Sequence, residues 1–213
     1  GLDWAVLAAD LLKLCVTIGV EKPFMVGHSM GATVITLAAS QSMQPPRGLI
    51  LIEPILLPEE FYRRQITVEQ HPLASKSIKR RNAWSGPDEA RDYLKSRKIF
   101  SGWDEEMIDL YLQYGMVTGD GGGLQLACPP RREAALFMGS TKNDPWPRMG
   151  GVNCPVMVVE GELSENRAYI DLPKAASIFP EGSYTLIENA GHLVPMEKPR
   201  EISSLIRNFF TAF

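Results

Sequence analysis

The sequence predicts an α/β fold in which a mostly parallel sheet is flanked by helices and interrupted by a helical cap insertion. Three observations predict it. Continuous apolar runs at 24–27, 49–52 and 155–159 are typical of parallel strands that are buried on both faces. Segments with apolar residues at helical spacing lie between these runs. One long segment, 57–147, has no clear run of this strand type and is rich in charge.

Residues 1–56 alternate between helix and strand patterns and begin the core. The expected elements, in chain order, are a helix over 3–18, a strand over 24–27, a helix over 32–43 and a strand over 48–53. Asp3 is a potential N-cap of the first helix, and Gly19 is its C-terminal stop. A strand, a helix and a second strand at this spacing form a right-handed crossover unit.

Residues 57–147 are expected to form a helical cap, because no Ser/Gly-rich linker separates them from the core. Amphipathic patterns predict helices over 89–98, 104–114 and 131–138, and residues 119–123 predict a flexible turn. Some aromatic side chains should line an apolar substrate pocket, while most fill the interior of the cap. The residues considered are Phe61, Tyr62, Trp84, Trp103, Tyr111, Tyr114 and Trp146.

Residues 148–213 return to the strand pattern and complete the core. The expected elements are a strand over 155–161, a helix over 168–179, a strand over 183–188 and a helix over 198–210. The loop before the last helix contains Ala190-Gly191-His192, a histidine preceded by small residues.

Composition excludes several function classes. At 213 residues, 45% apolar and 22% charged, the chain is an ordinary globular protein with room for one sizeable core. A net charge of −3 gives no reason to expect nucleic acid or an anionic membrane as a partner, and no apolar run approaches the roughly 18–20 residues of a membrane span. Cys15, Cys128 and Cys154 are widely spaced, which favours free thiols in a reducing compartment such as the cytoplasm.

The chemistry centres on Gly27-His28-Ser29-Met30-Gly31, which follows an apolar strand and precedes a helix. Gly-x-Ser-x-Gly in this setting is the nucleophile-elbow pattern. The turn holds the serine in a strained conformation, and we expect only small side chains to fit two residues away on either side. The helix that follows presents its N-terminus to developing negative charge.

The elbow, the cap insertion and the late histidine together resemble the α/β-hydrolase family, over nearly the whole chain and in the family's order. The resemblance implies that Ser29 is the nucleophile and His192 the general base that takes its proton. It implies no metal or organic cofactor. The stretch from Gly161 to Arg167 also resembles fungal secondary-metabolite and peroxisomal hydrolases of this fold.

The third catalytic group departs from the family pattern. The family usually carries an aspartate in a Gly-x-x-Asp run after the late strand, but here the run Gly161-Glu162-Leu163-Ser164 ends in serine. Some members instead use an acid at the end of the strand that follows the elbow, where this chain has Glu53. We favour Glu53, and Glu162 and Glu165 remain alternatives.

The other two histidines are assigned structural roles. Strand alternation directs His28 away from the serine side, and His71 should be either solvated or at a helix terminus.

An oxyanion hole needs two backbone donors, of which the amide of Met30 supplies one. The resemblance places the second donor in an earlier part of the fold, together with strands that would pair with the elbow strand. An unpaired apolar edge strand is a liability in a soluble protein, so we expect roughly 60–100 upstream residues, or a second chain, to complete the sheet.

The sequence thus predicts a serine hydrolase that cleaves an ester, thioester or lactone of a mid-sized apolar small molecule. The alternatives are carbon–carbon hydrolysis or a lyase reaction with the same triad, and a non-catalytic small-molecule-binding protein on this fold.

Overall fold

The computed structural model describes residues 2–119 and 121–212. At its centre lies a four-stranded sheet with the order β1-β2-β5-β6, in which every pairing is parallel. Its strands are β1 (Phe24–His28), β2 (Gly48–Ile52), β5 (Val156–Gly161) and β6 (Gly182–Ile187). The predicted fold class is therefore confirmed, and each strand expected from an apolar run is present.

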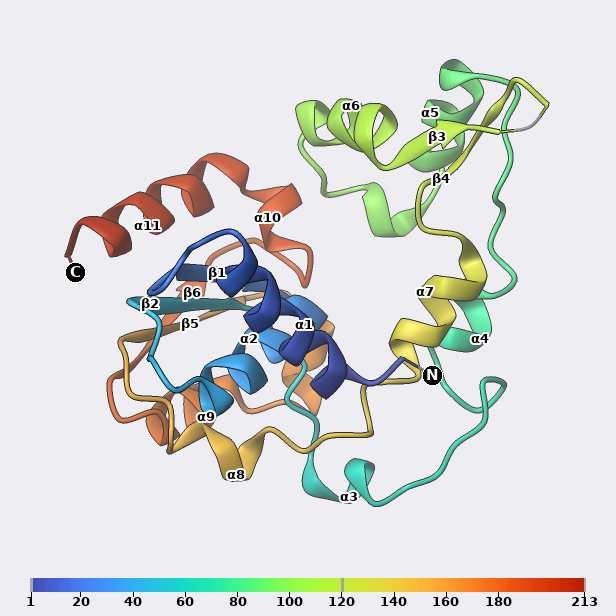
Figure 1. Cartoon of the computed structure of the whole chain (residues 1–213). Coiled ribbons are helices and arrows are strands. Elements are labelled where there is room, and N and C mark those ends of the chain that lie inside the picture. Colours follow the sequence, from blue (N-terminus) through green and yellow to red (C-terminus); the bar gives the residue numbers. More distant parts are fainter. Residues whose placement is uncertain (1, 120, 213) are drawn as a thin grey trace.

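Helices cover both faces of this sheet. In β2, Leu49 and Leu51 pack against α2 (Met30–Gln41) and α9 (Leu172–Ile178). The alternate residues Ile50 and Ile52 pack against the opposite layer, which α11 (Pro199–Ala212) provides. Figure 1 shows α11 on one side of the strands and α2 and α9 on the other. This double covering explains why β2 is apolar at every position instead of alternating.

The first helix, α1 (Trp4–Thr17), packs on α2 outside the sheet. Asp3 caps it as expected, since its side chain accepts a hydrogen bond from the amide of Ala5. The indole Nε1 of Trp4 donates to the carbonyl oxygen of Leu136, 2.8 Å away. This bond ties the start of α1 to the segment 57–147.

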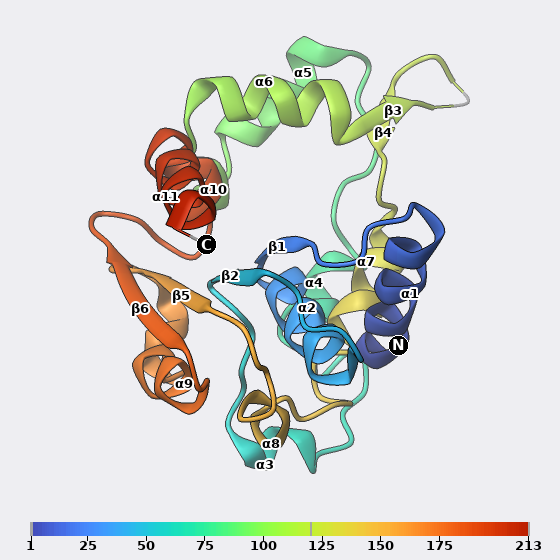
Figure 2. The ribbon, with the colours of Figure 1, turned by 60° about the vertical axis from the view of Figure 1, so that its left-hand side comes forward.

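The segment 57–147 contains short helices and one hairpin around a small core of its own. Its elements are α3 (Glu59–Tyr62), α4 (Ala74–Ser77), α5 (Pro87–Lys95), η1 (Lys98–Phe100), α6 (Glu105–Tyr114), β3 (Met116–Thr118), β4 (Leu124–Leu126) and α7 (Pro130–Phe137). Trp84, Leu94 and Ile108 are buried in that core. Figure 2 shows one end of α6 above α10 and α11, and the hairpin β3–β4 at the other end of α6.

The hairpin β3–β4 was not expected from the sequence. Its strands have three residues each, too few to show an alternating pattern, and a bridge between Trp84 and Leu124 supports them. The turn predicted over 119–123 falls between the two strands, although Asp120 lies outside the described residues.

Short helical elements lie before and after the late strands β5 and β6. The helix expected over 168–179 begins later, as α9, because Asp171 caps it by accepting from the amide of Lys174. A separate short turn, η2 (Glu165–Ala168), precedes it. After β6, α10 (Val194–Glu197) precedes α11, and α8 (Trp146–Met149) precedes β5. Within the described residues, no helix combines the length and apolarity needed to cross a bilayer.

Candidate active site

Ser29 occupies a tight turn between β1 and α2. Its φ of 54° and ψ of −120° lie outside the conformations that a serine ordinarily adopts. The turn is held because the amide of Ser29 donates to the carbonyl oxygen of Ile52, 2.9 Å away at the end of the neighbouring strand. The side chain is thereby placed at the carboxyl edge of the sheet, beside the N-terminus of α2.

The two glycines of the elbow have different roles. A Cβ at Gly27 would lie 2.6 Å from main-chain atoms of Gly31 and Ala32, so only glycine fits. A Cβ at Gly31 would meet no described atom within 4 Å outside its own helix. The expectation that only small side chains fit is thus met at Gly27, whereas at Gly31 there is room for a methyl group, which is itself small.

Glu53 follows β2 and lies one strand away from Ser29. Its φ of 49° is also positive, and its amide donates to the carbonyl oxygen of Val159, 2.8 Å away. The side chain is 1% exposed. Its Oε1 accepts a hydrogen bond of 2.7 Å from the amide of Gly161.

His192 lies between the serine and the glutamate. Its Nε2 is 2.9 Å from Oγ of Ser29, and its Nδ1 is 2.9 Å from Oε2 of Glu53. Ser29 lies 24 positions and His192 lies 139 positions from Glu53 in the sequence, yet the three side chains form one continuous hydrogen-bonded series.

The environment of Glu53 favours its ionised form. Burial alone would raise the pKa of this carboxyl, but hydrogen bonds from His192, Ser164 and the Gly161 amide outweigh burial and lower the pKa below its ordinary value. A carboxylate at this place can stabilise an imidazolium on His192.

The two alternative acids are placed elsewhere. Glu162 is exposed, and its Oε2 accepts from the amide of Asn189 at 2.9 Å. Glu165 is exposed in the first turn of η2. Within the described residues, neither carboxylate forms a hydrogen bond with His192.

Sequence reasoning missed two side chains beside the acid and the histidine. The hydroxyl of Ser164 donates to Oε2 of Glu53 at 2.6 Å. The side-chain amide of Asn166 lies 2.9 Å from Nδ1 of His192. For Ser164 the signal was present in the sequence, since Ser164 stands where the family places its aspartate, and a polar side chain there should lie beside the catalytic acid and histidine.

The remaining histidines have structural contacts. The Nε2–H of His28 donates to the carbonyl oxygen of His192 at 2.8 Å, and burial is the main reason that the pKa of His28 is lowered to about 4. His71 is buried rather than solvated, so that alternative is wrong. Its Nδ1 accepts from the amides of Leu73 and Ala74 at the start of α4, as the helix-terminal alternative predicted.

Met30 is the first residue of α2, so its amide lies at the helix N-terminus next to Ser29. This position suits a donor to a developing oxyanion. Among the described residues, no group of three or more histidine, cysteine, aspartate or glutamate side chains is arranged to hold a metal ion.

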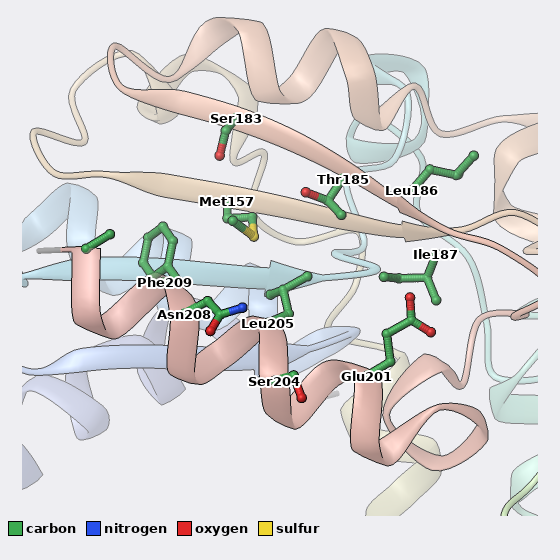
Figure 3. Close-up of a pocket in the computed structure, with 11 residues that line it drawn as sticks. Met157, Ser183, Thr185, Leu186, Ile187, Glu201, Ser204, Leu205, Asn208 and Phe209 are labelled. Atoms are coloured by element: carbon green, nitrogen blue, oxygen red, sulfur yellow. The ribbon is translucent and has the colours of Figure 1, made fainter.

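A groove on the sheet is separate from this constellation. It lies between β6 and α11, has a volume of about 610 Å³, and includes Met157, Thr185 and Leu205 among its lining residues (Figure 3). Of the described residues that line it, none is Ser29, Glu53 or His192.

Comparisons with known proteins agree with this architecture. The sequence model of the Alpha/beta hydrolase family matches residues 1–205. An Abhydrolase domain-containing protein of Alternaria alternata, ACTT2, is 24% identical over 219 residues, which cover 86% of this chain and 81% of that protein. E-2-(acetamidomethylene)succinate hydrolase superposes with a TM-score of 0.81 at 22% identity, covering 99% of this chain and 75% of that one. The thioesterase domain from the curacin biosynthetic pathway gives a TM-score of 0.74 at 18% identity, covering 96% and 73%.

Proposed function

Because this chain belongs to the alpha/beta hydrolase family, we propose that it is a serine hydrolase that cleaves an ester, thioester or lactone of a mid-sized apolar compound. The observation that carries the proposal is the continuous series from Ser29 through His192 to Glu53, with 2.9 Å at each step. A serine hydroxyl is a weak nucleophile at neutral pH, and this series is what activates it.

In the first half of the reaction, Ser29 attacks the carbonyl carbon of the substrate. Nε2 of His192 takes the hydroxyl proton, and Glu53 stabilises the resulting imidazolium through Nδ1. The amide of Met30 donates to the oxyanion, and the N-terminus of α2 favours the negative charge there. His192 then returns its proton to the leaving alcohol or thiol, which leaves an acyl group on Ser29.

In the second half, His192 removes a proton from water, which attacks the acyl group. Collapse of the second tetrahedral intermediate releases the acid and restores Ser29. Both halves need His192 to be neutral with its proton on Nδ1. The ionised carboxylate of Glu53 favours that tautomer.

The segment 57–147 contributes substrate selection in this proposal. It contacts α10, the short helix that follows the loop of His192, because the amide of Asp104 donates to the carbonyl oxygen of Met196 at 2.9 Å. Trp84 and Trp103 belong to its own core, as expected for most of the aromatic residues. Small-molecule substrates would therefore enter between this cap and Ser29.

We also propose that a further polypeptide segment pairs with the outer edge of β1. In the described sheet, β1 pairs only with β2, and Val26 at its centre is 39% exposed. Such a segment is the natural source of a second backbone donor for the oxyanion.

The proposal is tested by reaction with a fluorophosphonate probe, followed by mass analysis of the labelled peptide. We expect one label on Ser29, none in S29A, and hydrolysis of p-nitrophenyl esters that S29A cannot perform. E53Q should lower the rate of hydrolysis by several orders of magnitude, about 10⁴-fold in comparable triads, because the amide favours the wrong histidine tautomer. E162Q and E165Q should retain the rate.

Three outcomes would contradict parts of the proposal. An unlabelled Ser29 in the complete protein would favour a non-catalytic binding protein on this fold. Near-normal turnover by E53Q would transfer the acid role to Glu162 or Glu165. Labelling of Ser29 without hydrolysis of any ester or thioester would favour carbon–carbon hydrolysis or a lyase reaction with the same triad.

A further inference from the structure

The turn that follows β5 brings a second polar side chain to the inner nitrogen of His192. Nδ1 of His192 lies 2.9 Å from Oε2 of Glu53 and also 2.9 Å from the side-chain nitrogen Nδ2 of Asn166. Nδ1 of His192 therefore has two potential hydrogen-bond partners. Whether Nδ1 carries a proton decides whether each partner can accept from it or donate to it.

The proton on Nδ1 follows from Glu53. The pKa of Glu53 is lowered, so the carboxylate is ionised at neutral pH and can only accept a hydrogen bond. Nδ1 must then carry the proton and donate it. A nitrogen that already donates cannot accept from an NH₂ group, so the amide of Asn166 has to turn about its last bond, which brings its carbonyl oxygen to Nδ1 in place of Nδ2.

The turned side chain of Asn166 also has a hydrogen-bond partner for its NH₂ group. Before the amide turns, the hydroxyl of Tyr169 donates to Oδ1 of Asn166 at 2.6 Å. With the amide turned, its NH₂ donates to Tyr169 Oη, and the tyrosine proton points toward water because Tyr169 is 49% exposed. Oxygen and nitrogen of an amide side chain are distinguished by such networks rather than by shape.

The turn that carries Asn166 is held from both sides. Oγ of Ser164 accepts from the amide of Asn166 at 3.4 Å and donates to Glu53. On the other side, Arg167 forms an ion pair of 2.9 Å with Glu160, whose side chain is 3% exposed. Asn166 is thus fixed in position before any substrate binds.

Building on the proposed function, we propose that Asn166 is a positioning residue whose side-chain carbonyl accepts the Nδ1 proton of His192 together with Glu53. It holds the imidazole plane while the ring is neutral, and it stays in contact when the ring takes the proton of Ser29. The strand end that lacks the family's aspartate therefore still supports the histidine, through a neutral acceptor.

The first test is kinetic. N166L removes the acceptor at nearly constant volume and should lower kcat about fivefold with KM unchanged, the effect of one neutral hydrogen bond. N166D keeps an acceptor and should retain kcat within about twofold. The matched control is N208L, an exposed asparagine on α11 that is not part of the site and should behave as wild type.

The second test is rescue of a damaged acid. In E53Q, the Gly161 amide keeps the glutamine oxygen on its side, so the NH₂ group faces Nδ1 and favours the wrong tautomer. Adding N166D places a carboxylate at position 166, the second position whose side chain lies against Nδ1 of His192. E53Q/N166D should therefore hydrolyse at least about tenfold faster than E53Q, whereas E53Q/N166L should not. A residue that only packs would give no rescue.

The third test does not depend on turnover. The chain has three histidines, and their ring nitrogens can be followed by ¹⁵N NMR after histidine labelling. The contacts of His28 and His71 place their protons on Nε2, so His192 alone should carry a proton on Nδ1. N166L should shift that Nδ1–H resonance, and N208L should leave it unchanged.

The outcomes separate the two proposals. If wild type neither labels nor hydrolyses, the proposed function fails, while the NMR result still decides the contact of Asn166. If wild type is active but N166L leaves kcat and the Nδ1–H resonance unchanged, or if N166D gives E53Q no rescue, the role of Asn166 is overturned.

Discussion

Among the residues that the structure describes, three other than glycine have positive φ, and all three follow strands of the central sheet. Ser29, Glu53 and Asn189 come directly or shortly after β1, β2 and β6, with φ near 50°. Two of them carry the proposed nucleophile and acid. Such backbone conformations cost of order 1–3 kcal/mol each and persist only where the surroundings fix them. Here main-chain bonds to the neighbouring strand fix Ser29 and Glu53.

The two elbow glycines give a matched pair of substitutions. G27A should destabilise the fold by about 1–3 kcal/mol and abolish labelling of Ser29, because its Cβ would displace the main chain of α2. G31A should keep the fold and raise stability by up to about 1 kcal/mol, since alanine favours a helix over glycine. Thermal unfolding and fluorophosphonate labelling of both variants check this. Equal losses of thermal stability and of Ser29 labelling in G27A and G31A would contradict the different roles of the two glycines.

The site residues that the sequence indicated are those whose positions follow from the local chain conformation. Ser29 lies in a motif that determines its own turn, and Glu53, favoured from the family resemblance, ends an apolar run that is typical of a buried strand. Asn166 depends instead on a short 3₁₀ turn and on an ion pair between Arg167 and Glu160. No local pattern encodes that arrangement, so the sequence could not indicate that Asn166 meets His192.

Among the helices and strands, η2 is short but carries a side chain that contacts the catalytic histidine. It has four residues and no buried side chain, yet it carries Asn166 and follows Ser164. Its position depends on Glu160 in β5, which accepts hydrogen bonds from Arg167 and Tyr184. Burial is the main cause that raises the pKa of Glu160, so its charge needs these partners.

Removing the partner of Glu160 should therefore disturb both stability and catalysis. R167M should cost about 1–2 kcal/mol, less than a fully buried pair because Arg167 is 41% exposed, and should lower Tm by about 3–6 °C. It should also lower kcat, since the turn that holds Asn166 loosens. The control R63M breaks an exposed pair with Glu59 on α3 and should change stability by less than about 0.5 kcal/mol. Equal effects of R167M and R63M would show that η2 does not depend on the ion pair.

The elements that the sequence did not predict are all short. Helices α3, α4, α8 and α10 have four residues each, and β3 and β4 have three. Periodicity needs a longer window before it distinguishes a helix or a strand from a loop. These elements are fixed by tertiary contacts, such as the indole of Trp146 donating to the carbonyl oxygen of Leu57 at 2.8 Å.

The outer edge of β1 is an unpaired edge of the described sheet. β1 is apolar and contains no charged residue or proline, the features that usually protect an edge strand. The neighbouring helix α1 also exposes apolar side chains, with Val6 57% and Val16 81% exposed. An exposed apolar strand edge and exposed apolar helix residues are both typical of a surface that another segment covers.

The 213-residue chain prepared alone should therefore self-associate, and V26K, which places a charge on the edge strand, should reduce that association. A strand-forming segment of the same hydrolase should keep the protein monomeric and accelerate hydrolysis, because it supplies the second oxyanion donor, worth about 10²–10³ in rate. Light scattering after size exclusion, intact mass and ester hydrolysis measure these effects. A monodisperse monomer that contains only this chain and hydrolyses esters at full rate would refute the pairing of β1, because the site would then need neither a covered edge nor a second donor from another segment.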